Sequence, residues 1–133
     1  MSQENLEKCR RAYEAFNRGD SGGMVAYLAA EFEFVSTGAV PDARGVYRGA
    51  EGWIDFVGWL RSEFEEPRVE INELTEAGDQ VLVSVTLRGR GKQSGVDTTW
   101  DHWHLWTVQD GKVVRGRAFT SKPEALEAAG LRE

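Results

Sequence analysis

Two histidines and an aspartate lie among tryptophans in one short stretch of the chain. The stretch 97–109 contains the run W-D-H-W-H-L-W, with both histidines of the protein and three of its five tryptophans. Histidine is the side chain whose ordinary pKa best suits proton transfer near neutral pH. Burial between tryptophans would raise the pKa of a carboxyl group. The first candidates for acid/base chemistry are therefore Asp101, His102 and His104.

These candidates divide between two faces of a predicted strand. Asp110-Gly111 separates 97–109 from a second β-rich run, K-V-V-R-G-R-A-F-T-S, and Asp-Gly between two such runs predicts a hairpin. Side chains alternate across a strand, so Trp100, His102, His104 and Trp106 share one face. The other face carries Asp101, Trp103, Leu105 and Thr107. Neither set is typical of a face exposed to solvent.

The N-terminal half is predicted to be mainly helical. Leu6, Cys9, Tyr13 and Phe16 follow the spacing of an amphipathic helix that ends near Gly19, and Asp20 can cap a shorter one carrying Met24, Tyr27 and Leu28. A short strand at 32–36 and a loop at 37–49 follow. A long helix is expected over 50–66, ended by Pro67. Its apolar stripe consists of Trp53, Phe56, Val57, Leu60 and Phe64.

From Arg68 the apolar period changes to that of strands. Runs at 69–74 and 81–87 flank the turn at 76–79, and a small helix is expected between Ser121 and Gly130. This order predicts an α+β fold: a curled antiparallel (mixed) sheet, covered by three N-terminal helices, with a short C-terminal helix. A long helix across a curled sheet encloses a cone-shaped cavity, which is a common place for a small ligand. We expect a single domain over residues 1–133.

Composition excludes several classes of protein. The chain has 133 residues, 41% hydrophobic and 29% charged, and a net charge of −6, so nucleic acid and anionic membranes are not expected partners. No apolar run approaches the roughly 20 residues that span a bilayer. The single cysteine, Cys9, cannot form an internal disulfide, and the first residues lack the pattern of a secretory signal. A cytoplasmic location is therefore expected.

Four motifs resemble one superfamily in order and spacing. They are Y-E-A-F-N-R-G-D at 13–20, Y-R-G at 47–49, D-G-K-V-V-R at 110–115 and E-A-L-E-A-A-G-L at 124–131. On these motifs the chain resembles the nuclear transport factor 2-like superfamily, in its SnoaL-like polyketide cyclase and ketosteroid isomerase branch. The resemblance covers nearly the whole chain. It implies a cone-shaped pocket and a homodimer formed through the outer face of the sheet.

The resemblance also implies which faces point inward. Counting along the strands places Asp101, Trp103 and Leu105 inside the cone, together with Ala118 and Thr120 of the last strand. The dimer interface would then be formed by Trp100, His102, His104 and Trp106. A bulge would reverse this register and bring the histidines inside, so both arrangements stay open.

The matching aspartate of the isomerases donates a hydrogen bond to a developing oxyanion, which makes Asp101 the leading candidate acid. Other isomerase residues differ, because Ala12 stands where the family has its oxyanion tyrosine and Ser36 where it has its proton-shuttling aspartate. Ala118 stands where the related epoxide hydrolases carry an aspartate. Steroid isomerisation and epoxide hydrolysis are therefore disfavoured.

The sequence predicts a pocket for a small hydrophobic or polycyclic molecule, with no cofactor and no metal. As an enzyme, the protein would be a cofactor-independent isomerase, cyclase or dehydratase in which Asp101 transfers the proton. Tyr13 or a histidine would polarise an oxygen. The alternative is a non-catalytic module for ligand binding or protein interaction. The expected ligand contacts are Trp53, Phe56, Leu60, Phe34, Trp103, Leu105, Ala118 and Thr120.

Overall fold

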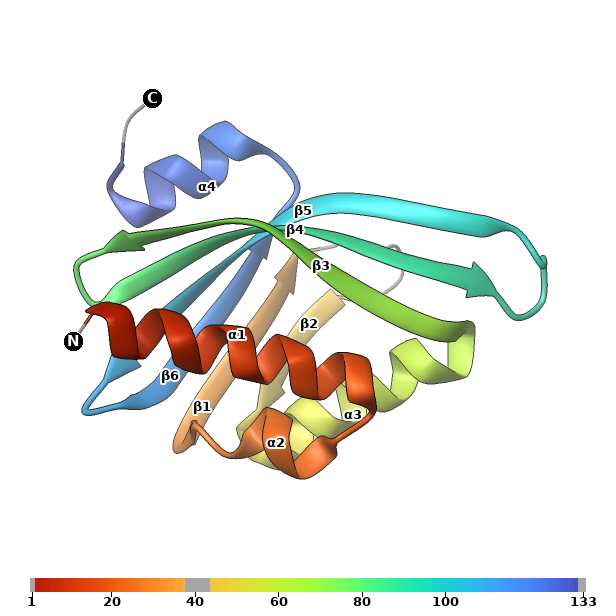
Figure 1. The fold of residues 1–133 in the computed structure, drawn as a ribbon, viewed down its shortest axis with the longest axis horizontal. Helices are drawn as coiled ribbons and strands as arrows, with labels where there is room; N and C mark the ends of the chain where they lie inside the picture. Colours follow the sequence, from red (N-terminus) through yellow and green to blue (C-terminus); the bar gives the residue numbers. More distant parts are fainter. Residues whose placement is uncertain (1, 38–43, 132–133) are drawn as a thin grey trace.

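The computed structural model describes residues 2–37 and 44–131, and its backbone forms one curled sheet with helices on both sides (Figure 1). Strand order in the sheet is β2-β1-β6-β5-β4-β3; β1 and β6 are parallel and all other neighbours are antiparallel. This confirms the expected fold class. The elements in chain order are α1 (Ser2–Arg18), α2 (Ser21–Val25), β1 (Leu28–Thr37), β2 (Arg44–Arg48), α3 (Gly49–Glu63), β3 (Phe64–Ala77), β4 (Gln80–Gly91), β5 (Asp97–Gln109), β6 (Lys112–Phe119) and α4 (Lys122–Ala129).

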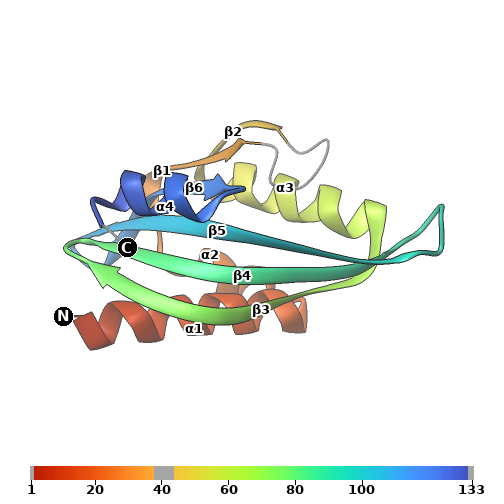
Figure 2. The same ribbon diagram turned by 90° about the horizontal axis from the view of Figure 1, so that it is seen from above.

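Two apolar clusters hold the helices to the two faces of the sheet. The larger one joins α1 and α3 to the inner face, and its centre is an aromatic group in which the rings of Phe34 and Trp53 lie 5.0 Å apart. The smaller one joins α4 to the outer face through Leu82, Leu105 and Ala125. Figure 2 shows α1 and α4 on opposite sides of β5 and β4. Among the described residues, no helix is long and apolar enough to cross a membrane.

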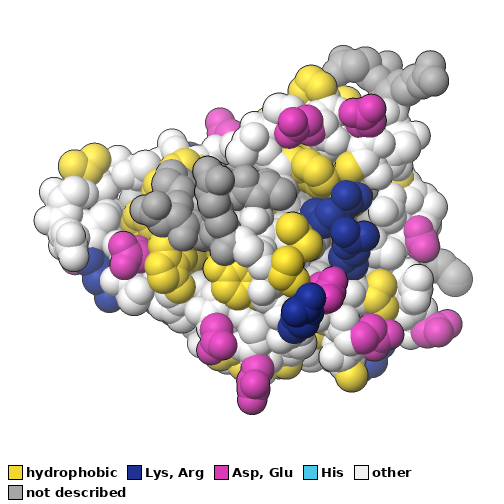
Figure 3. Space-filling view, turned by 180° about the vertical axis from the view of Figure 1, so that it is seen from behind, with side chains coloured by type: hydrophobic (Ala, Val, Ile, Leu, Met, Phe, Trp, Pro, Cys, Tyr) yellow, Lys and Arg dark blue, Asp and Glu magenta, His cyan; other side chains and the backbone are white. Residues whose placement is uncertain are grey.

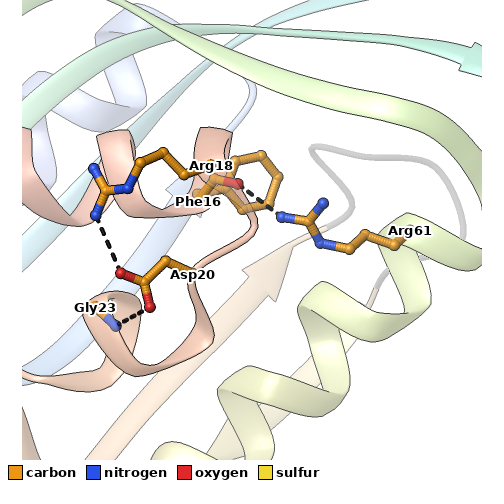
Figure 4. A network of polar contacts seen from close by, with 5 residues as sticks. All are labelled: Phe16, Arg18, Asp20, Gly23 and Arg61. Carbon is orange, nitrogen blue, oxygen red and sulfur yellow. Dashed lines mark hydrogen bonds and ion pairs between the residues drawn. The ribbon is translucent and has the colours of Figure 1, made fainter.

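Polar contacts fix the corner between α1 and α2 and attach α3 to it (Figure 4). The Asp20 carboxylate accepts hydrogen bonds from the Gly23 backbone at 3.0 Å and from Arg18 at 3.1 Å. Both lower the pKa of Asp20, so it stays ionised as the cap of α2. Arg61 of α3 donates to the Phe16 carbonyl at 2.7 Å and lies over the Phe16 ring. The end of α1 is thereby held against α3.

The first half of the chain contains more strand than the sequence indicated. The second helix is only α2, and β1 already begins at Leu28, because the Tyr27 carbonyl accepts a hydrogen bond from Val113 as the chain joins β6. Sheet pairing here prevails over helical spacing. The expected loop at 37–49 contains β2, which pairs with β1; residues 38–43 of that loop lie outside the described residues.

The long helix also ends earlier than expected, and Pro67 lies within β3 rather than at the helix end. The pairing of β3 with β4 is interrupted between Glu65 and Arg68, and Glu66 has φ 45°. A bulge on an edge strand is where a sheet tolerates proline. Beyond the bulge, the side chain of Asn17 bonds both the N–H and the carbonyl of Val69, at 2.8 and 3.0 Å, and so attaches α1 to this edge.

The core leaves no room for a side chain at Gly116 of β6. A Cβ atom there would overlap the ring of Trp106 and meet Phe34 at 3.0 Å. Gly58, by contrast, lies on the exposed side of α3, where an added Cβ meets nothing within 4 Å. The two glycines therefore predict opposite responses to the same substitution.

We expect Gly116→Ala to lower the free energy of unfolding by about 1–3 kcal/mol, because overpacking displaces Trp106. Gly58→Ala should raise the free energy of unfolding by about 0.5–1 kcal/mol, since alanine has a higher helix propensity than glycine at an exposed position within a helix. Urea denaturation of both variants measures the two changes. Equal stability of Gly116→Ala and the wild-type protein would contradict the packing described around Trp106.

Candidate functional site

The inner face of β5 carries the histidines and not the aspartate. His102 and His104 are 4% and 8% exposed and lie opposite Val85 and Val83 of β4, whose side chains are fully buried. Trp106 follows on the same face and is buried in the larger cluster. On the face of the molecule that Figure 3 shows, no histidine side chain is visible. The arrangement with the histidines inside is therefore the one that the structure adopts.

Counting from the resemblance gave the wrong face for three residues. Asp101 is exposed on the outer face, where its carboxylate accepts a 2.7 Å hydrogen bond from Thr86. Trp103 and Leu105 lie on the same face and pack with the residues of α4. A register error of one residue exchanges the two faces of a strand, and here the larger aromatic stripe is the one buried beneath α1 and α3.

The expected dimer contacts are wrong for the same reason. His102, His104 and Trp106 are buried within the chain, and Trp100 lies edge-on against Phe64 with ring centroids 5.0 Å apart. None of the four is placed on the outer face of the sheet. A homodimer stays a prediction, and other residues would have to form its interface.

A hydrogen-bonded chain joins α1 to β5 inside the core. Trp106 Nε1 donates to the Tyr13 hydroxyl at 2.8 Å, and that hydroxyl lies 2.7 Å from Nδ1 of His104. An indole N–H can only donate, so the Tyr13 oxygen accepts from it. The phenolic hydrogen is then directed to Nδ1 of His104, the other partner that the described residues provide. This arrangement assigns His104 the neutral form with its hydrogen on Nε2.

Burial keeps all three ionisable groups of this region uncharged near neutral pH. It lowers the pKa of His104 well below its usual value, with a further contribution from His102, and it raises the pKa of Tyr13 well above its usual value. The pKa of His102 is also lowered by burial, although the Trp100 backbone and Asp101 partly oppose this. Both imidazoles are therefore expected to be neutral.

His102 is left with an unsatisfied nitrogen. Its Nδ1 atom is buried and has no hydrogen-bond partner among the described residues. The ring lies 4.8 Å from that of His104, at an interplanar angle of 76°. Buried polar atoms are nearly always hydrogen-bonded, and an unpaired one costs about 1–3 kcal/mol. Within the described part of the chain, the fold thus leaves this nitrogen without a partner.

Both histidines line an apolar cavity of about 100 Å³ between α1, α3 and the sheet. Tyr13 lines it as well, so the structure brings together three of the four candidate catalytic residues. Of the predicted ligand contacts, five line the cavity: Trp53, Phe56, Leu60, Phe34 and Ala118. Trp103, Leu105 and Thr120 do not. Whether the five contact a ligand stays a prediction.

Sequence reasoning placed other cavity residues elsewhere or gave them no role. Trp106 was assigned to the outer face, and Lys8 and Met24 were given no part in the site. Cys9 lines the cavity one helical turn before Tyr13, and burial raises the pKa of its thiol to about 12, so it contributes as an apolar contact. Its helical spacing from Tyr13 was the available signal. Among the described residues, no three histidine, cysteine or acidic side chains are grouped to hold a metal ion.

Solved structures share this fold over nearly the full chain. An NTF2-like protein of unknown function from Burkholderia pseudomallei K96243 has 25% identity and a TM-score of 0.80, covering 93% of this chain and 95% of its own. TerC, co-crystallised with polyporic acid, has 24% identity and a TM-score of 0.78, covering 96% and 98%. IdmH from Streptomyces antibioticus, a candidate polyketide cyclase, has 21% identity and a TM-score of 0.75, covering 96% and 99%.

No curated protein sequence matches this chain. The family model of the SnoaL-like domain matches residues 9–116, which include the second part of α1, all of α2 and α3, and most of the sheet. Every cavity residue except Asn5, Lys8 and Ala118 falls within that range. Together with the confirmed fold, this match shows that the chain belongs to the SnoaL-like domain family of the NTF2-like superfamily.

Proposed function

We propose that the protein binds a small, largely apolar molecule in the cavity and that His102 receives a hydrogen bond from it. The observation that carries this proposal is the buried Nδ1 atom of His102, which has no hydrogen-bond partner among the described residues, in a side chain that lines an apolar cavity. In the tautomer with its hydrogen on Nε2, the Nδ1 atom is an acceptor, and a hydroxyl or amide donor on a ligand would satisfy it and recover the cost of leaving it unpaired. Aromatic side chains around it, such as Trp53 and Phe56, would contact the rest of the ligand.

The cavity volume limits the size of the buried part. A volume of about 100 Å³ is below the usual range for drug-sized ligands, but a dry cavity of roughly 150 Å³ in another protein holds benzene. A single ring or a similar apolar group is therefore the part we expect inside. A polycyclic ligand would need side chains such as Trp53, which is only half-buried, to move.

The same arrangement supports acid/base chemistry without a cofactor. A neutral imidazole can accept a proton from a hydroxyl or from a carbon next to a carbonyl group, and burial keeps His102 in that form. Tyr13 and Trp106 hold His104 in one tautomer, so its Nε2 hydrogen has a fixed position. An isomerase, cyclase or dehydratase would use such a pair. The fold shared with the candidate polyketide cyclase IdmH is consistent with this class.

Non-catalytic binding is the alternative, and one observation favours it. No aspartate or glutamate is among the described residues that line the cavity, and Asp101 lies on the other side of the sheet. The carboxylic acid expected from the sequence is thus missing from the site. A protein that only binds its ligand needs no such acid, whereas an enzyme would have to use the histidines and Tyr13.

A matched pair of one-ring probes tests the role of His102. Phenol can donate a hydrogen bond to Nδ1 and toluene cannot. We therefore expect the wild-type protein to bind phenol about fivefold more tightly than it binds toluene. In His102→Leu this advantage should disappear, while Asp101→Asn, on the outer face, should keep it. Titrations followed by the indole N–H signals of Trp53 and Trp106 in NMR measure both affinities. An undiminished phenol preference in His102→Leu would exclude His102 as the acceptor.

Catalysis is tested separately from binding by hydrogen exchange. If His102 abstracts protons, 2-indanone in D₂O should exchange its hydrogens next to the carbonyl faster with wild-type protein than in buffer. His102→Leu should lose about a hundredfold of that acceleration, the lower end of the range for a general base. Proton NMR follows the exchange. Binding of 2-indanone without acceleration would favour the non-catalytic alternative.

Neutral buried histidines also make stability depend on pH. The pKa values of His102 and His104 are lowered in the folded protein, so below about pH 6.5 the unfolded chain binds more protons. Stability is therefore full above that pH and lost as pH falls, by up to ~1.4 kcal/mol per pH unit for each ring. Urea denaturation between pH 7.5 and 5.5 should show this slope in wild-type protein. The double variant His102→Gln/His104→Gln should be nearly flat, and an unchanged slope in it would show that other groups cause the dependence.

A further inference from the structure

One end of the cavity reaches the protein surface. Most lining residues are buried, but those between the first turns of α1 and the β5–β6 turn are half-exposed. Figure 1 shows this part of α1 close to that turn. We call this region the open end of the cavity and define it by Asn5, Lys8, Tyr27, Gly111 and Val113.

Lys8 is held at the open end by uncharged groups. Its Nζ atom donates to the Gly111 carbonyl at 3.0 Å and lies 5.6 Å from the centroid of the Tyr27 ring. An ammonium group has three donor hydrogens, so the carbonyl uses one of them. The carbonyl and the ring hold the ammonium in position without neutralising its charge.

No carboxylate neutralises this lysine within the described part of the chain. Five ion pairs occur there and none includes Lys8; the nearby Glu7 pairs instead with Arg11, at 3.4 Å. Lys8 is also the one side chain with a permanent charge among the described residues lining the cavity. The protein as a whole has a net charge of −6, so a cation placed here gives the cavity a local preference opposite to that of the whole molecule.

From this placement we infer that the natural ligand is an apolar acid. Its anionic group, a carboxylate or a similar oxyanion, binds Lys8 at the open end, and its apolar part enters the cavity toward His102. This inference rests on the proposed function, because it names the class of molecule that the same cavity takes. A neutral ligand would leave the two remaining donor hydrogens of Lys8 to water. An acid would satisfy one of them with a charge-assisted hydrogen bond.

Matched acids and amides test the inference. The probes are phenylacetate, 3-phenylpropionate and 4-phenylbutyrate, each compared with its own amide, so that the length that fits is found by experiment. For the best length we expect the wild-type protein to bind the carboxylate about three- to tenfold more tightly than the amide at low salt. Raising the salt concentration to 0.3 M should reduce that ratio, because the open end is exposed to solvent.

Two lysine variants separate a local contact from a change of net charge. Lys8→Gln should lose the preference for the carboxylate, while its amide can still donate to the Gly111 carbonyl. Lys112→Gln removes the same charge from an exposed position beside the β5–β6 turn and should keep the preference. The indole N–H signals of Trp53 and Trp106 report whether a probe is in the cavity. Circular dichroism confirms that each variant is folded.

The outcomes distinguish this inference from the proposal beneath it. We expect the wild-type protein to bind the amide and to bind the carboxylate more tightly. Lys8→Gln should remove this preference, and Lys112→Gln should retain it. Two results would overturn the acid as ligand class and leave the cavity as a binding site. In one, the amide binds and Lys8→Gln keeps the wild-type preference for the carboxylate; in the other, the amide binds and the wild-type protein shows no preference for the carboxylate. If neither acid nor amide shifts the indole signals, the cavity does not take such molecules, and both proposals are wrong.

Discussion

The contact between Tyr13 and β5 decides which face of that strand lies inside the protein. Its hydroxyl accepts from Trp106 and lies against His104, so it can be satisfied only if both side chains face α1. Leaving the buried hydroxyl of Tyr13 without these partners would cost as much free energy as the burial of several methylene groups provides. Gly116 on the neighbouring strand makes room for the Trp106 ring. The inner face, the cavity and the position of His102 all follow from this arrangement.

The cavity is apolar because the fold satisfies its other polar groups internally. Tyr13 and Nδ1 of His104 satisfy each other, and the outer-face polar groups Asn72, Thr86 and Asp101 form their own hydrogen-bonded chain. Among the described residues that line the cavity, the imidazole of His102 lies at its inner part and the ammonium group of Lys8 at its open end. Few and separated polar groups in an apolar site fix the orientation of a ligand more than they contribute to affinity.

The sequence was sufficient for the fold class because periodicity, caps and turns are local signals. Asp20 as a cap, Asp110-Gly111 as a hairpin turn and the stripe on α3 were all predicted from spacing. The strand at 44–48 was missed because it is only five residues long and its second residue is a glycine, which is too short a pattern to recognise. The inner face of β5 was not predictable, because both faces are aromatic and only contacts with α1, distant in the sequence, distinguish them. Lys8 was missed for a similar reason, since its role depends on a turn about 100 residues away.

Because side chains alternate along a β-strand, the face of β5 that lies inside determines which functional groups enter the cavity. Asp101 and His102 are neighbours in the sequence, so they cannot both face the same cavity unless a bulge separates them, and β5 pairs with β4 without interruption across these residues. With Asp101 inside, the site would have held a carboxylic acid for donation to an oxyanion. With His102 inside, it holds a neutral base beside a second imidazole of fixed tautomer. A shift of one residue in register would thus exchange the two chemistries on an unchanged scaffold, which explains why membership of this family does not by itself define the reaction.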